Sequence, residues 1–316
     1  MRASKFKWDI IILFALLSIA LALFSTINPA LHVAEIIRLD ENPGTNPIFS
    51  PDGKQIAFVR TGELVVMNLS TNGQTKHEIE GILSDIQWLT NSRLLYLKRE
   101  LPDVYDELRF WIVDIQSGKT IPLTEILPEH PENVTLSPSK STIAYIAETR
   151  IRLFDIKTKS FSFVPFPTRG RCHSLAWLSN ETVIYSCSQQ LWETNIHSGE
   201  SRMLFNLEDC NCYSFSPSPD GRWLLFEKHT NELYWSGSFY IMPLQSNLFT
   251  VKSHSRLNLA GSFIKHLLTP NYFEWPGVSQ TSWAPDGKSF VFSGSRRVWQ
   301  DSYESFQDGI WLVELD

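Results

Sequence analysis

The chain opens with a long stretch that carries no charged side chain. Residues 10–24 are almost entirely apolar, and the uncharged stretch continues to residue 27. Eighteen residues of helix rise about 27 Å, which is close to the roughly 30 Å hydrocarbon core of a bilayer. The pattern therefore predicts a transmembrane signal-anchor helix over residues 10–27, between a short N-terminus (1–9) and a linker (28–34).

The charges around this stretch predict its orientation. Arg2, Lys5 and Lys7 precede it, and the remainder of the chain is mildly acidic. By the positive-inside rule, we expect the N-terminus in the cytoplasm and the following domain in the periplasm or outside the cell. A cleaved signal peptide is the alternative. The small-residue pattern Ala20-Leu21-Ala22 lies inside the apolar run rather than after it, which favours an uncleaved anchor.

Beyond residue 30 the pattern changes to short strands, and one phrase recurs. It is an apolar strand ending in an aromatic residue or Leu, then a Ser-Pro-Asp-Gly turn, then a returning apolar strand. Pro fixes one backbone angle of such a turn and Gly supplies a position with positive φ. We find full copies at 47–58 and 281–292, a copy with two additional turn residues at 213–226, a copy without Asp-Gly at 134–145, and shortened copies at 88–96 and 177–185.

Each copy is followed by a third strand that often ends in Asp or Asn, and then by a more polar fourth strand. Six units of four short strands predict an all-β fold, a six-bladed β-propeller over residues 35–316. A β-sandwich also contains recurring turns, but it does not repeat one phrase six times. The final unit ends at its third strand, so we expect residues 35–39 to supply its missing fourth strand and close the ring.

The phrase Phe/Trp-Ser-Pro-Asp-Gly-Lys, in the copies that begin at residues 47 and 281, resembles the repeat of the TolB-like propellers, a WD40-like family. The resemblance covers residues 35–316 and implies a propeller of the kind that usually serves as a protein-binding platform or as a gate on an attached hydrolase. It is specific for the fold and much less so for function. Because little precedes the propeller here, the particular role of TolB is not carried over.

Charge and motifs exclude several functions. The net charge is −6, and we find no dense stripe of Lys and Arg beyond the N-terminus, so nucleic acid is not an expected partner. The sequence has no G-x-S-x-G elbow, no H-E-x-x-H pair and no phosphate-binding glycine loop. We therefore predict a non-enzymatic protein without a cofactor or metal, which binds protein partners at the membrane or cell envelope. The carboxylates of Asp52, Asp220 and Asp286 are interpreted as turn formers.

A second hypothesis concerns the central channel. The first strand of each unit ends in an aromatic residue or Leu, which we call the anchor residue of that unit. The residues three positions before the six anchor residues are Asn46, Asp85, Asn133, Ser174, Cys212 and Gln280. By strand alternation they should face away from the anchor column and ring the channel mouth. An Asp and two Asn side chains, with Glu132 adjacent to Asn133, suit Ca²⁺, so a metal-dependent propeller hydrolase or lactonase is the alternative function. A polar, water-filled entrance is the more common meaning of such a set.

The four cysteines fall close together in the sequence. In an oxidising compartment we expect disulfides, although four-thiolate zinc and free thiols remain alternatives. Cys172 and Cys187 should lie opposite each other on adjacent strands and form the preferred pair. Cys210 and Cys212 are too close in sequence to join each other easily.

Three insertions interrupt the repeat, at 99–109, 243–262 and 296–308. Each is either a solvated loop or part of a binding rim. Exposed aromatic residues mixed with charges are typical of interfaces. We therefore expect the binding rim to use Trp299, Tyr303 and Phe306, together with Tyr105 from the first insertion.

Overall fold

The computed structural model describes most of the chain beyond residue 32. The described residues are 33–79, 81–99, 107–148, 150–166, 172–187, 190–206, 211–229, 237–244, 265–266, 273–274, 281–300 and 303–316. The predicted N-terminus and anchor, residues 1–27, lie outside them. Within the described ranges, no helix is long and apolar enough to cross a membrane.

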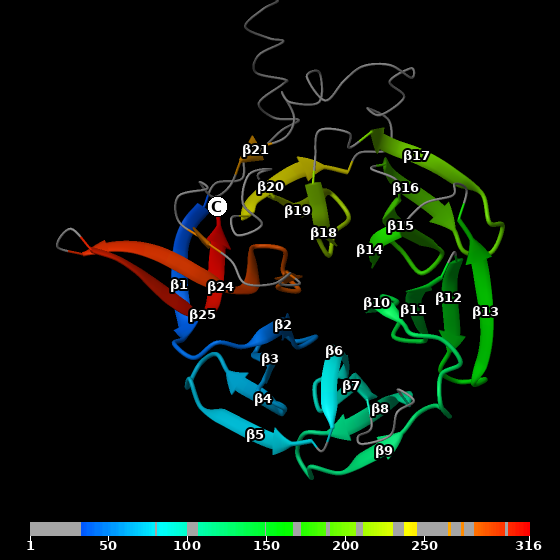
Figure 1. Ribbon diagram of the computed structural model, residues 1–316, viewed down its shortest axis with the longest axis horizontal. Coiled ribbons are helices and arrows are strands. Elements are labelled where there is room, and N and C mark those ends of the chain that lie inside the picture. Colours follow the sequence, from blue (N-terminus) through cyan, green and yellow to red (C-terminus); the bar gives the residue numbers. More distant parts are fainter. Residues whose placement is uncertain are drawn as a thin grey trace, which may run out of the picture.

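The described residues form six antiparallel sheets arranged around a central axis, as the repeated phrase predicted (Figure 1). In blades 1 to 3 the strands follow each other outward from the axis in sequence order. Their bounds are β2 (Thr45–Phe49), β3 (Gln55–Arg60), β4 (Glu63–Asn68) and β5 (Gln74–Glu78); β6 (Ile82–Thr90), β7 (Arg93–Arg99), β8 (Leu108–Asp114) and β9 (Thr120–Pro122); β10 (Glu132–Leu136), β11 (Thr142–Ala147), β12 (Arg150–Asp155) and β13 (Ser160–Pro165).

Blades 4 and 5 repeat this order, and blade 6 is completed from the other end of the chain. Blade 4 consists of β14 (Cys172–Trp177), β15 (Thr182–Cys187), β16 (Gln190–Asn195) and β17 (Ser201–Asn206); blade 5 of β18 (Asn211–Pro217), β19 (Trp223–His229), β20 (Gly237–Pro243) and β21 (Lys265–His266); blade 6 of β22 (Phe273–Glu274), β23 (Ser282–Trp283), β24 (Ser289–Gln300), β25 (Tyr303–Leu315) and β1 (Val33–Asp40).

The predicted closure is confirmed. β1 pairs antiparallel with β25, so Val33 lies opposite Leu315 and Ile37 opposite Leu312. The guanidinium of Arg38 donates two hydrogen bonds to the carbonyl of Asp308, at 2.5 and 3.1 Å. A Cβ added at Gly309 would collide with the carbonyl of Asp40, so this position requires glycine for close approach of the two strands. The first and last described segments are therefore held in one sheet.

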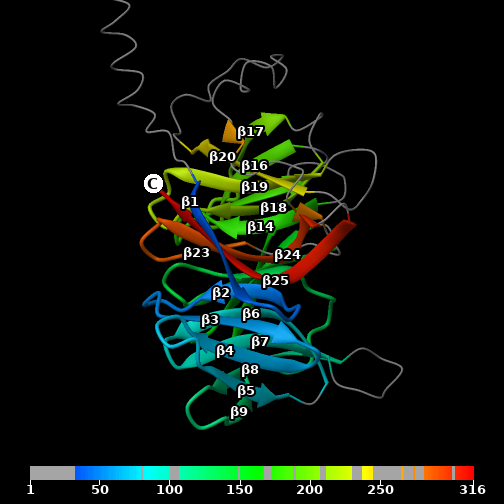
Figure 2. The ribbon, with the colours of Figure 1, turned by 90° about the vertical axis from the view of Figure 1, so that its left-hand side faces the viewer.

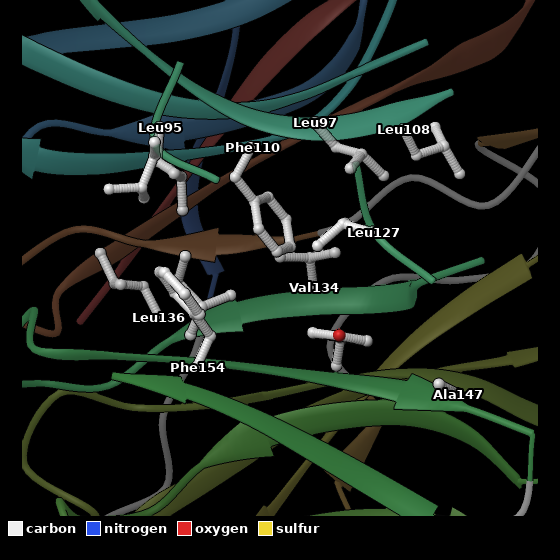
Figure 3. Packing of buried hydrophobic residues seen from close by; sticks show 12 residues of the cluster. Leu95, Leu97, Leu108, Phe110, Leu127, Val134, Leu136, Ala147 and Phe154 are labelled. Carbon is white, nitrogen blue, oxygen red and sulfur yellow. The ribbon is translucent and has the colours of Figure 1, made fainter. Parts of the chain in front are cut away.

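The apolar core lies in layers between neighbouring blades, because each sheet is buried on both faces. In the layer between blades 2 and 3, Leu95, Leu97 and Phe110 of blade 2 meet Leu136 and Phe154 of blade 3 (Figure 3). Similar clusters fill the spaces between the other blades. Flat aromatic and branched side chains suit such layers because they pack closely against a pleated surface.

The antiparallel order gives the disc two different faces. The turns between first and second strands, such as Pro51-Asp52-Gly53, share one end with the turns between third and fourth strands; we call this end the turn face. The turns between second and third strands lie at the opposite end, which we call the hairpin face, marked by the β24–β25 connection after Gln300. Figure 2 shows the disc edge-on, with the β24–β25 tip on one side and the C-terminus on the other.

The Asp residues of the recurring phrase form turns, as predicted. Asp52 Oδ1 accepts hydrogen bonds from the Ser50 hydroxyl, at 2.7 Å, and from the Lys54 backbone N–H, at 3.1 Å. The bond from Ser50 is the main reason that the pKa of Asp52 lies below its usual value. Asp220 bonds Ser218 in the same manner. These carboxylates serve the backbone of separate blades.

In blade 5 the alignment of the phrase needs a correction. Ser218 N–H bonds the carbonyl of Trp223, as Ser50 N–H bonds that of Gln55, so Pro217 occupies the position of Phe49. The interpretation of two additional turn residues is wrong. Phe215 precedes the true anchor position by two residues, and its aromatic character and preceding Ser made it the more obvious match in the sequence.

Candidate functional site: the channel mouth

The predicted channel residues share one backbone feature. Asn46, Asp85, Asn133 and Ser174 all have positive φ, between 47° and 54°. Each lies where the register between the first and second strand of its blade shifts. Asn and Asp tolerate this left-handed conformation better than other residues with a Cβ. The residue types at these positions are thus explained first by the bulge, which also interrupts the strand alternation that the sequence argument assumed.

These four residues line one cavity on the axis of the disc. Its volume is about 560 Å³, and its lining includes residues from the first strands of all six blades. The positions with positive φ lie near the hairpin-face ends of these strands, whereas Pro138 and Pro219 contribute from the turns at the opposite end. The cavity is therefore the central channel, with Asn46, Asp85, Asn133 and Ser174 toward its hairpin-face mouth.

Several polar groups of the channel wall hold neighbouring blades together. The hydroxyl of Ser174, a buried side chain, accepts a hydrogen bond from Phe215 N–H of blade 5 at 2.9 Å. Ser282 of blade 6 accepts one from Phe49 N–H of blade 1 at 3.2 Å. Because buried polar groups need such partners, part of the channel wall is structural.

Tryptophan side chains make a second set of contacts between blades. The indole N–H groups of Trp88, Trp177 and Trp283 donate to carbonyls in the first strand of the preceding blade, at 3.3, 3.4 and 2.8 Å. The acceptors are the equivalent residues Ile48, Thr135 and Ser216. Trp therefore occupies the anchor position in blades 2, 4 and 6, where it links each of these blades to its neighbour.

The chemistry of the described lining is polar with little charge. Gln87 and Thr135, which sequence reasoning did not select, add an amide and a hydroxyl to the predicted set, and Asp85 is the one carboxylate among the described lining residues. Gln87 follows Asp85 by two residues, so counting alternate positions onward from Asp85 would have selected it. In the described part of the chain, no group of three or more His, Cys, Asp and Glu side chains is placed to hold a metal.

Other predicted site residues are placed only in part. Gln280 and Tyr105 lie outside the described residues. With the corrected alignment of blade 5, the residue three positions before the end of the first strand is Ser214 and not Cys212, and the register shift of this blade lies between the two. Trp299, Tyr303 and Phe306 lie in the β24–β25 hairpin, where Trp299 is opposite Glu304, Gln300 opposite Tyr303 and Arg297 opposite Phe306.

This hairpin is longer than its counterparts. β24 and β25 have 12 and 13 residues, whereas β3 and β4 have 6 each. The insertion at 296–308, which the sequence left as a possible loop, continues the two strands of blade 6 and projects beyond the ring (Figure 1). The hairpin lies at the same face of the disc as the channel mouth.

The cysteines follow the preferred pairing. Cys172 and Cys187 lie opposite each other on β14 and β15 and are joined by a disulfide. Both side chains are buried in the layer between blades 3 and 4. Cys210 lies outside the described residues, and of Cys212 only the strand position in β18 is described.

Comparison with known proteins places the fold. No family model matches the sequence, and no curated protein sequence matches it. Solved structures do match the shape. TolB from Acinetobacter baumannii has a TM-score of 0.55 at 10% identity over 93% of this chain and 68% of that one. An oligogalacturonate lyase in complex with manganese has a TM-score of 0.55 at 15% identity, over 88% of this chain and 79% of that one. Regucalcin from Agrobacterium tumefaciens, a calcium-binding protein, has a TM-score of 0.57 at 12% identity, over 90% of this chain and 95% of that one.

The fold is thus that of the TolB-like six-bladed propellers, as the recurring phrase predicted. Proteins at this level of identity share architecture alone. The three similar structures are a TolB, a lyase and a calcium-binding protein, so the fold does not decide the chemistry at the channel.

Proposed function

We propose that this chain is a membrane-anchored, extracytoplasmic propeller that acts as a protein-binding platform without catalysis of its own. The observation that carries the proposal is the long β24–β25 hairpin, which extends beyond the ring at the same face of the disc as the channel mouth (Figure 1). A paired ribbon presents its residues on a defined backbone, which lowers the entropic cost of binding compared with a loose loop. Trp, Tyr and Phe are also the residues enriched at protein interfaces.

The polarity of the mouth supports the same proposal. Amides and hydroxyls from Asn46, Gln87, Asn133 and Thr135 surround a single described carboxylate, Asp85. Such groups bind water or peptide backbone readily, but they offer no general-base and nucleophile pair of the kind that hydrolysis uses.

The direction of β1 sets the expected orientation at the membrane. β1 begins at Val33, opposite Leu315, at the turn face, and reaches the hairpin face at Asp40. A short linker from the predicted anchor would therefore meet the turn face first. In this arrangement the channel mouth and the long hairpin face away from the membrane. The disulfide between Cys172 and Cys187 supports an oxidising compartment.

Site-specific photo-crosslinking tests the platform. A photoreactive residue at position 299 should crosslink to a discrete protein in native membranes. The same residue at Lys54, an exposed position at the turn face, serves as the matched control. A product from position 299 that is missing from position 54 supports the proposal. Equal products from both positions, or none from 299, would contradict it.

Thiol labelling tests the proposed topology. A single cysteine introduced at exposed Ser117 should react with a membrane-impermeant maleimide in intact cells or spheroplasts. A cysteine introduced at Ser4 should react only after the membrane is permeabilised. Labelling of position 117 only after permeabilisation would place the propeller in the cytoplasm.

The alternative function is a metal-dependent hydrolase or lactonase. It is favoured by the oxygen donors Asp85, Asn46 and Asn133 in one cavity, since Ca²⁺ binds carboxylate and amide oxygens. It is also favoured by the manganese and calcium named for two of the similar structures. One described carboxylate is few for such a site.

Asp85→Asn separates the two functions, because Asn keeps the tolerance for positive φ that Ala would lose. The alternative predicts that calorimetric binding of Ca²⁺ or Mn²⁺ to the wild type is lost in this variant. The platform predicts no such binding to either protein, and unchanged crosslinking from position 299.

A further inference from the structure

The outer edge of blade 3 is exposed in an unusual way. β13 is the last strand of its sheet, with no strand partner on its outer side among the described residues. Its sequence, Ser-Phe-Ser-Phe-Val-Pro, contains no charged residue. All six of its residues pair in unbroken register with β12. Pro165 ends the strand and leaves the preceding five residues as a regular edge.

The other outer strands are protected in the ways that natural sheets use. β5 carries Lys76 and Glu78. β17 contains Arg202 and pairs through a register shift. β1 has two shifts and charged residues, and β9 and β21 have three and two residues. Charges, bulges and shortness all discourage the addition of a further strand. β13 lacks each of these features along its length.

Two exposed aromatic rings lie on this unprotected strand. Phe161 and Phe163 are 45% and 55% exposed, and their spacing places them on one side of β13. The ring of Phe161 lies 4.8 Å from that of Phe154, which belongs to the core layer between blades 2 and 3. Phe163 lies below the guanidinium groups of Arg150 and Arg152, at 5.2 and 5.9 Å. These contacts fix the positions of the two rings, which lie on the face of the sheet that is turned toward blade 2.

Two more exposed apolar side chains lie on the blade 2 side of the same core layer. Ile121 on β9 is 46% exposed and lies opposite Ile112, which packs on the same core layer. Ile126 is 45% exposed and belongs to the segment whose Glu129 bonds Arg152 of blade 3. We call these four residues, Ile121, Ile126, Phe161 and Phe163, the blade 2–3 patch. They are four of the five large apolar side chains that are exposed in the described chain; the fifth is Met203.

We propose that β13 accepts an extended segment of a partner protein as a fifth strand of blade 3. Backbone hydrogen bonds along the free edge would provide affinity, and alternate apolar side chains of the segment would cover the blade 2–3 patch. The exposed side chains of Lys157 and Lys159 lie in the turn before β13. Their positive charge favours a segment that carries an acidic residue at the end beside this turn. This local charge is opposite in sign to the net charge of the whole chain, which is −6.

This surface lies on the outer circumference of the disc, away from the channel (Figure 1). The inference therefore goes beyond the proposed function, and the two can fail separately. A partner at the channel mouth is tested from position 299, and a strand on blade 3 is tested with a peptide.

The probe is the acetylated and amidated peptide Glu-Val-Thr-Val-Thr-Val-Glu with a fluorescent label, titrated into the full chain while anisotropy is recorded. Its acidic ends allow either strand direction. We expect saturable binding, and slower hydrogen exchange of the backbone amides of residues 160–164 with peptide bound. A matched peptide that is N-methylated at alternate residues keeps its side chains but cannot form the strand ladder, and we expect it not to bind.

Protein variants test the patch. Phe161→Ser with Phe163→Ser should weaken binding by about tenfold or more, because the apolar cover is removed. Both side chains are exposed, so the melting temperature should change little. Met203→Ser removes a similarly exposed apolar side chain from blade 4 and should leave binding unchanged. Lys157→Glu with Lys159→Glu should weaken the binding of the acidic peptide. The same variant should bind a peptide with Lys at both ends more tightly than the wild type does.

Four results would overturn the proposal. They are no binding at millimolar peptide, equal binding to the double Phe variant, equal binding of the N-methylated peptide, and a wild-type dimer in sedimentation that the double Phe variant loses. The last result would assign the edge to a second copy of this chain.

Discussion

At the scale of single residues, backbone conformation accounts for many of the conspicuous side chains. Gly53, Gly221 and Gly287 have φ between 67° and 70° in the turns of blades 1, 5 and 6. Lys140 has φ 60° at the equivalent turn of blade 3. A residue with a Cβ is disfavoured in this region by roughly 1–2 kcal/mol. Blade 3 therefore carries strain in the turn that lost its Asp-Gly.

Lys140→Gly should relieve this strain. We expect it to raise the free energy of unfolding by about 0.5–1 kcal/mol, since part of the gain is offset by the flexibility of Gly in the unfolded chain. Gly53→Ala is the reverse change in blade 1 and should lower the free energy of unfolding by about 1 kcal/mol. Urea unfolding measures both. A destabilised Lys140→Gly variant would contradict this explanation of the turn.

The tryptophan contacts between blades give a second prediction at this scale. Trp283→Phe removes the 2.8 Å bond to the carbonyl of Ser216 and leaves that carbonyl without its donor. Trp192→Phe removes an indole N–H that is buried without a hydrogen-bond partner in the described structure. Both changes remove similar ring volume. We expect Trp283→Phe to cost about 1–2 kcal/mol more than Trp192→Phe in unfolding experiments. Equal costs would show that the bond between blades contributes nothing.

The residue scale also shows what could be predicted from the sequence. The turn role of Asp52 and the Cys172–Cys187 pair followed from local pattern and register. The channel position of Asn133 was predicted, but its left-handed bulge was not, because strand alternation assumes a regular register. The assignment of Pro217 rather than Phe215 as the anchor residue of blade 5 depends on a backbone hydrogen bond that the sequence does not reveal.

At the scale of elements, the junction between β1 and blade 1 depends on one buried carboxylate. Asp40 accepts hydrogen bonds from Arg60 and Gln74 of blade 1, both at 2.6 Å, and from Asn42 N–H at 2.8 Å. Burial alone would raise the pKa of Asp40, but these bonds outweigh it and the pKa lies below its usual value. The closing strand is therefore held to its neighbour by a charge that acid removes.

The sign of the pH dependence follows from this lowered pKa. The stabilisation by Asp40 is fully present above the ordinary carboxyl pKa and is lost as the pH falls through the lower folded-state value. Asp40→Asn should cost up to about 3 kcal/mol at neutral pH and flatten the loss of stability in acid. Glu63→Gln, which breaks a partly exposed pair with Lys76, should cost less than about 1 kcal/mol. A wild-type acid profile in Asp40→Asn would refute the role of Asp40.

The disulfide belongs to the same scale, because it ties β14 to β15 across 15 residues. Chain entropy gives about 3 kcal/mol for a loop of this length, so reductant should lower the melting temperature. The variant with Cys172→Ala and Cys187→Ala should show no response to reductant, whereas Cys210→Ala with Cys212→Ala should keep the response. A wild type that melts identically with and without reductant would show that the bond does not stabilise the fold.

Some elements were less predictable than others. The closing strand could be expected at 35–39 because the sixth unit lacked a fourth strand, and β1 spans Val33–Asp40. The length of β24 and β25 was not evident, because residues 296–308 mix charges and aromatics without a clear period. The free edge of β13 becomes visible only when the outer strands of all blades are compared.

At the scale of the whole molecule, the two faces of the disc differ in content. The turn face carries the Pro-Asp-Gly turns and the start of β1, and the hairpin face carries the channel mouth and the long hairpin. The proposed anchor on one side and binding surface on the other give the propeller the geometry of a platform held above a membrane. The blade 2–3 patch would add a second contact on the circumference.

The platform is tested most directly by comparing how much crosslinked partner two variants recover from native membranes. One variant carries Trp299→Ser, Tyr303→Ser and Phe306→Ser in the hairpin, and the other carries Asp85→Asn in the channel. Chemical crosslinking and quantitative mass spectrometry would measure the partner relative to wild type, with melting temperatures as the control for folding. We predict that the hairpin variant loses about tenfold or more of the partner and that Asp85→Asn retains it. Full recovery with the hairpin variant would contradict the account.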